Sequence, residues 1–103
     1  TAYSKAMGPR MRERWIAVLD GPAPPNRTVT LGGQEFVQVA ACKAHDCAAN
    51  NMMVLWSAPK KQLYGIVRQV GVNALLGAPP ADLTPDVTRL WKETWNPEPA
   101  PAR

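Results

Sequence analysis

The five residues Met52–Trp56 are apolar at every position, and this run constrains the fold more than any other feature of the sequence. A strand without a polar face is usually covered by other elements on both sides. We therefore expect residues 52–56 to form a central strand of a β-sheet. The segments before and after this run should then supply its neighbouring strands.

Those segments alternate between apolar and polar residues, as half-buried strands do. Gly32 and Gly33 follow residues 28–31 and precede residues 35–41, and glycine supplies the positive φ angles that a two-residue hairpin needs. Residues 63–70 alternate in the same way after the central run. The pattern predicts four antiparallel strands connected as a meander.

Helices are expected at both ends of the chain. Residues 2–7 read as a helix that stops at Gly8-Pro9, and residues 11–19 read as a second, short helix. We expect one helical turn at residues 72–76. A longer helix should begin at Thr84-Pro85-Asp86 and end at Asn96-Pro97. Its apolar stripe consists of Val87, Leu90, Trp91 and Trp95.

The predicted fold class is therefore α+β: an antiparallel β-sheet meander flanked by helices from the N-terminal and C-terminal segments. We expect residues 1–96 to form a single domain and residues 97–103, rich in proline and alanine, to form a flexible tail. The sequence begins at Thr1 without an apolar leader, as expected of a processed or a trimmed chain.

Composition excludes several functional classes. No apolar run approaches the roughly 18–20 residues that a membrane-spanning helix needs, so we expect no membrane span. The net charge is +4, but the basic residues form no dense run interleaved with aromatic residues. We therefore expect no binding to nucleic acid.

The segment Cys42–Cys47 contains both cysteines and the only histidine of the chain within six residues. It lies between two predicted strands and is therefore expected to be a turn. Two cysteines this close indicate one disulfide and an oxidising compartment such as the periplasm. The candidate site residues are Cys42, Lys43, Ala44, His45, Asp46 and Cys47.

Three uses of this turn remain open at this stage. As a simple staple, a disulfide closing so small a ring would contribute about 2 kcal/mol. As a binding loop, the turn would gain from being ordered in advance of the encounter. As a small metal or redox site, it would use cysteine, histidine and aspartate ligands, although structural zinc sites usually draw two pairs of ligands from separated segments. A hydrolytic site lacks a recognisable nucleophile pattern.

The residues of the turn resemble a known family. Cys-Lys-Ala-His-Asp-Cys at 42–47 is similar to the Cys-Lys-Pro-His-Asp-Cys loop of the inhibitor of vertebrate lysozyme (Ivy) family, with Ala44 in place of the proline. The flanking segments 28–32, 54–57 and 64–67 also resemble that family, and Trp15 has a counterpart there.

The resemblance implies a bacterial periplasmic inhibitor and not an enzyme, with no cofactor and no metal. In that family a disulfide-closed loop enters the active-site cleft of c-type lysozyme, and the loop histidine, here His45, reaches the two catalytic carboxylates. The implied partner is a c-type lysozyme; the alternative within the family is a divergent member that acts on a lytic transglycosylase of the cell itself or on another envelope protein. A homodimer is left open. The alternative from another class is the small metal or redox site described above.

Overall fold

Five antiparallel strands form one sheet in the order β1-β2-β3-β4-β5 in the computed structural model, which describes residues 1–95. The strands are β1 (Arg27–Leu31), β2 (Gln34–Cys42), β3 (Asn51–Ser57), β4 (Gln62–Gln69) and β5 (Val72–Leu76). The predicted meander is confirmed, and the apolar run Met52–Trp56 lies in the central strand, as expected. Residues 96–103, which include the predicted helix stop and the predicted tail, lie outside the described residues.

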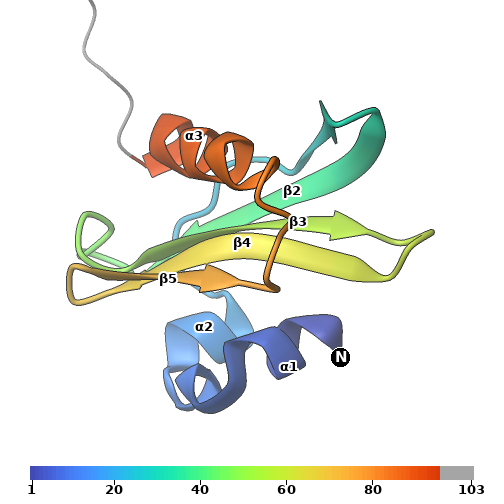
Figure 1. Cartoon of the computed structure of the whole chain (residues 1–103). Helices are drawn as coiled ribbons and strands as arrows, with labels where there is room; N and C mark the ends of the chain where they lie inside the picture. Colours follow the sequence, from blue (N-terminus) through green and yellow to red (C-terminus); the bar gives the residue numbers. More distant parts are fainter. Residues whose placement is uncertain (96–103) are drawn as a thin grey trace, which may run out of the picture.

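Helices cover both faces of the sheet (Figure 1). On one face lies α3 (Thr84–Trp95); on the other lie α1 (Ala2–Met7), a 3₁₀ helix η1 (Gly8–Arg12) and α2 (Arg14–Val18). The α+β class predicted from the sequence is thus confirmed. Helix α1 begins with a capping box, in which Thr1 and Ser4 exchange hydrogen bonds, and it ends at Gly8, which has φ 58°.

The central strand faces two separate hydrophobic cores. Met53 and Leu55 point to the α3 side, whereas Met52 and Val54 point to the side of α1 and α2. All four are buried, with at most 3% of the side chain exposed. Each such burial contributes about 1.5–3 kcal/mol, which explains why the strand has no polar face. From α3, the predicted stripe residues Val87, Leu90 and Trp91 are buried against the sheet, and Trp95 packs beside them.

The β1–β2 hairpin turns at Gly32 and Gly33, which have φ angles of 57° and 76°. Leu31 pairs with Gln34 across this two-residue loop. Two positive φ angles in succession are the geometry of a type I′ turn, which matches the right-handed twist of the strands. The prediction from the glycine pair is confirmed.

Two predictions from the sequence are wrong in detail. Residues 72–76 form strand β5 and not a helical turn, because the two-residue turn before them lets them pair along the whole of residues 65–69 of β4. The predicted helix over residues 11–19 is shorter, since Glu13 is extended at φ −76° and ψ 124° and separates η1 from α2. Leu19, in the left-handed conformation, ends α2.

Candidate functional site

The turn that follows β2 is closed by a disulfide between Cys42 and Cys47, whose Cα atoms are 5.0 Å apart. Cys42 is the last residue of β2 and is fully buried, so one end of the bridge is fixed in the sheet. The four residues between the cysteines, at 43–46, are all exposed. The predicted disulfide is present, so neither sulfur is a free thiol in this structure.

The backbone of this turn is held by its own hydrogen bonds. The Lys43 N–H donates to the Asn50 carbonyl at 3.0 Å, and the Asp46 N–H donates to the Lys43 carbonyl at 2.9 Å. The Asn50 N–H in turn donates to the Asp46 carbonyl at 3.0 Å. His45 takes the left-handed conformation with φ 66°, which histidine accepts more readily than most residues. The result is a defined, solvent-exposed tip that carries the imidazole.

A buried amide connects this tip to the rest of the sheet. The Asn50 side chain donates from Nδ2 to Oδ2 of Asp46 at 2.8 Å and accepts at Oδ1 from the Val70 N–H at 3.0 Å. Asn50 is only 4% exposed. The Asp46 carboxylate therefore accepts its hydrogen bond from a side chain and not from the backbone of its own turn. The orienting partner is thus a side chain four residues further along.

A second buried amide connects the turn to α3. Asn51, 2% exposed, donates from Nδ2 to the Cys47 carbonyl at 2.7 Å and accepts at Oδ1 from Trp91 Nε1 at 2.8 Å. One turn further along α3, Trp95 Nε1 donates to the Met52 carbonyl at 2.8 Å. Both indoles therefore hold the position where the turn re-enters the sheet. Through Asn51 and Trp91, the exposed tip is therefore connected to the hydrophobic core on the α3 side of the sheet.

The roles of Asn50 and Asn51 were not predicted from the sequence. The available signal was their position: two polar residues stand directly before the apolar run of β3, where polar groups that become buried need hydrogen-bond partners. Their partners lie up to 40 residues away in the sequence, so the pattern alone did not identify them.

The segment before β1 supports the other side of the turn. The Cys42 N–H donates to the Pro22 carbonyl at 3.0 Å. A Cβ atom added at Gly21 would lie 1.9 Å from the Cys42 carbonyl oxygen, so only glycine allows the two backbones to approach this closely. The base of the turn is therefore supported on both sides, by Pro22 and by the two asparagines.

The turn exposes one imidazole, one ammonium group and one carboxylate, from His45, Lys43 and Asp46. Among residues 1–95, no three or more His, Cys, Asp or Glu side chains are grouped so that they would hold a metal ion. Within the same residues, no helix has both the length and the apolar character needed to cross a membrane.

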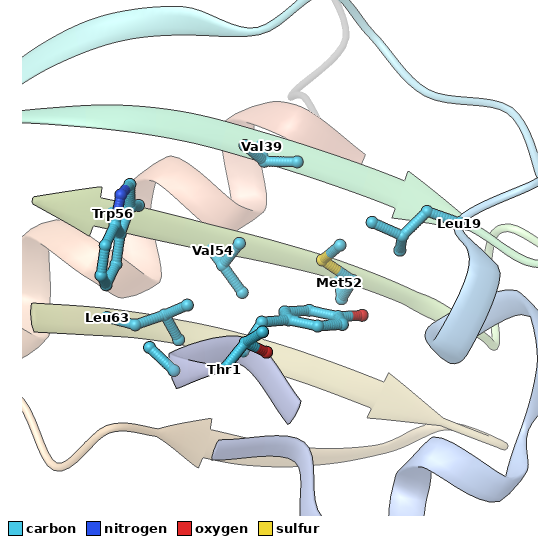
Figure 2. A pocket seen from close by; sticks show the side chains of 9 residues that line it. Thr1, Leu19, Val39, Met52, Val54, Trp56 and Leu63 are labelled. Carbon is cyan, nitrogen blue, oxygen red and sulfur yellow. The ribbon is translucent and has the colours of Figure 1, made fainter. Parts of the chain in front are cut away.

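An apolar groove lies elsewhere, on the sheet face that carries α1 (Figure 2). It has a volume of about 420 Å³ and runs between α1 and strands β2, β3 and β4. Its lining residues are Thr1, Ala2, Tyr3, Leu19, Val39, Met52, Val54, Trp56 and Leu63. The Tyr3 hydroxyl donates to the Ile16 carbonyl at 2.6 Å, and burial raises the pKa of Tyr3 to about 12. The groove therefore offers apolar contact and not acid–base chemistry.

Comparison with known proteins identifies the family of the chain. A family model described as "Inhibitor of vertebrate lysozyme (Ivy)" matches residues 1–98. The inhibitor of vertebrate lysozyme from Pseudomonas aeruginosa is 34% identical over 53 residues, which are 52% of this chain and 35% of that protein. The protein of the same name from Escherichia coli strain K12 is 39% identical over 52 residues, 50% of this chain and 32% of that protein. The aligned segment thus spans about a third of the length of these relatives.

Proposed function

This chain belongs to the inhibitor of vertebrate lysozyme (Ivy) family, and from that premise we propose that it inhibits a c-type lysozyme by placing the loop 42–47 in the active-site cleft. The observation that carries the proposal is the exposed tip, with His45 between two ends that are fixed by a disulfide and by buried amides. A loop ordered before binding loses little conformational freedom on entering a cleft. The disulfide fits an oxidising compartment, and we propose the periplasm as the place of action.

His45 is the group suited to the target's chemistry. A retaining glycosidase has two carboxyl groups about 5–5.5 Å apart, of which one is ionised and the other is an acid with a raised pKa. The two nitrogens of one imidazole point to opposite sides of the ring, so it can donate to one carboxylate and, when protonated, to both. In a cleft that excludes water, such charge-assisted hydrogen bonds are the strong kind.

Replacement of His45 tests this proposal. We expect His45→Ala to weaken inhibition of a c-type lysozyme by at least about thirtyfold, corresponding to a contact worth about 2 kcal/mol. The fold should be unaffected, because the side chain is exposed. The measurement is the inhibition constant in a cell-wall lysis assay. Lys60→Ala, in the exposed turn at the opposite end of β3, serves as the control and should inhibit normally. An unchanged inhibition constant for His45→Ala would refute the proposed role of the loop.

A second candidate target is a lytic transglycosylase of the cell itself. The net charge of +4 favours it, because c-type lysozymes are themselves basic and two positive proteins repel each other at long range. Parallel inhibition assays with a c-type lysozyme and a lytic transglycosylase distinguish the two. Tighter inhibition of the transglycosylase would assign the loop to that enzyme.

A further inference from the structure

The turn between β4 and β5 breaks a local rule of hairpin chemistry. Gln69 pairs with Val72, so Val70 and Gly71 form a two-residue loop, with φ angles of 50° and 80°. Type I′ turns of this kind strongly prefer asparagine, aspartate or glycine at the first position. A β-branched residue with positive φ is a genuine outlier, because its branched side chain crowds the backbone. Valine at position 70 is thus unfavourable for the turn itself.

The side chain at this position gains nothing from burial either. Val70 is 78% exposed and Val72 is 71% exposed, more than the other large apolar side chains of residues 1–95 that lie on the surface. Within this chain, Val70 therefore costs backbone strain and contributes no burial in return. Strained residues of this kind cluster at binding and catalytic sites, where the side chain serves a purpose outside the local structure.

The β4–β5 turn lies beside the loop 42–47. The Val70 N–H donates to Asn50 Oδ1 at 3.0 Å, and the Gly71 N–H donates to the Ala49 carbonyl at 3.0 Å. The same Asn50 side chain binds Asp46 within the loop. Figure 1 shows the two turns at one end of the sheet, the loop after β2 in green and the β4–β5 turn in gold. One buried amide therefore connects Val70 to the loop, and Val72 lies two residues further along the chain.

Arg68 holds the two turns together from a second direction. Its Nε donates to the Ala48 carbonyl at 3.1 Å, and its Nη1 donates to Asn73 Oδ1 at 3.1 Å. The guanidinium thus bridges the segment after the loop and the first residues of β5. Asn50 and Arg68 therefore both hold the β4–β5 hairpin next to residues 46–50.

We propose that Val70 and Val72 form a second, apolar contact of the inhibitory surface, packing on the rim of the enzyme cleft that the loop enters. The inference rests on the proposed function. Ligand clefts are lined largely by apolar and aromatic side chains around a few polar groups, so the rim offers a matching apolar surface. The loop supplies the polar contact with the carboxylates, and the valines supply the apolar burial beside it. Selection for this contact explains valine where the turn prefers asparagine.

The test exploits opposite effects on stability and binding. Val70→Asn installs the residue that the turn prefers, so it should raise the melting temperature by about 4 °C or more. The same change removes the apolar contact and should weaken inhibition of a purified c-type lysozyme by about tenfold, the loss expected for one buried valine. Val72→Thr, which keeps the shape and suits a strand, should also weaken inhibition without loss of fold.

Ala78→Asn is the matched control. Ala78 is exposed and has a positive φ of 47°, but it follows β5 at the end away from the loop. This variant should raise the melting temperature and leave the inhibition constant unchanged.

The outcomes separate this inference from the proposed function. A wild-type chain that inhibits, with Val70→Asn equally potent, overturns the apolar contact alone. Loss of self-association by Val70→Asn in sedimentation experiments, with inhibition intact, would also overturn it and assign the valines to contact between two copies. A wild-type chain that fails to inhibit overturns the proposed function and this contact with it.

Discussion

Asn51→Ala should lower the free energy of unfolding by about 3 kcal/mol, because it removes two hydrogen bonds, one of them buried and the other part-buried. The Trp91 indole N–H loses its acceptor at 2.8 Å, and the Cys47 carbonyl loses its donor at 2.7 Å. A buried group without a partner costs about 1–3 kcal/mol. For a domain of this size, a loss of about 3 kcal/mol lowers the melting temperature by about 12 °C or more. Thermal and urea unfolding followed by circular dichroism measure both quantities.

A double-mutant cycle isolates the contact between the two side chains. Trp91→Phe keeps an aromatic ring in the core but removes the indole N–H that donates a hydrogen bond to Asn51 Oδ1. In the double variant the indole N–H is no longer present, so its cost disappears. The combined loss should therefore be smaller than the sum of the single losses by about 1–2 kcal/mol. Strict additivity would refute the idea that this hydrogen bond anchors the turn.

Inhibition gives a second readout of the same residue. Gln38→Ala is the matched control, since Gln38 is also a buried amide of the sheet that donates to α3, here to Thr94 Oγ1 at 3.0 Å. Both variants should lose stability, but only Asn51→Ala should inhibit more weakly when fully folded, because only Asn51 holds the Cys47 carbonyl. Equal inhibition by both variants would mean that the loop does not depend on this anchor.

Two further predictions concern the disulfide and the phenol. Replacing Cys42 and Cys47 by serine should lower stability by only about 2 kcal/mol in denaturant unfolding while weakening inhibition strongly, because the small ring mainly orders the loop; a large stability loss with normal inhibition would contradict this. Burial raises the pKa of Tyr3 from 10.0 to about 12, so the unfolded chain loses this proton at a lower pH than the folded chain does. The free energy of unfolding should therefore keep its full value below pH 10 and fall by about 2 kcal/mol as the pH rises through 12. Tyr3→Phe should remove this part of the dependence of stability on pH, and an unchanged dependence would contradict the reasoning.

A strand of the sheet was predictable where a few consecutive residues already show the pattern of apolar and polar positions that a strand requires. Residues 52–56 are apolar throughout, and a central strand covered on both faces is the simplest structure that satisfies every position. Strand β5 was not predictable on the same basis. Its five residues are too few to distinguish a period of 2 from a period of 3.6, and its strand conformation depends on the hydrogen bonds that β4 supplies. In β5, pairing with β4 therefore decides the conformation, and the local sequence pattern does not.

The candidate site was likewise predictable only in part. The six residues of the turn stand together in the sequence, so the segment that carries the imidazole could be identified directly. Its anchors could not, because Asn50 reaches Val70 and Asn51 reaches Trp91, across 20 and 40 residues. The apolar stripe of α3 was predicted from its spacing, but the use of the indole N–H groups depends on which polar atoms the sheet places beneath them.

The energetics of the loop explain why its anchors matter as much as its tip. Holding the backbone of the four exposed residues 43–46 in one conformation costs about 4–8 kcal/mol of conformational entropy. The disulfide offsets only about 2 kcal/mol of this. Five hydrogen bonds of the turn and its two asparagines contribute roughly 1 kcal/mol each, which closes the difference. With Ala44 where the related loop has proline, the tip has less rigidity of its own, so its order depends on the disulfide and on the buried asparagines. The order that the proposed inhibition requires of this loop therefore comes from inside the fold.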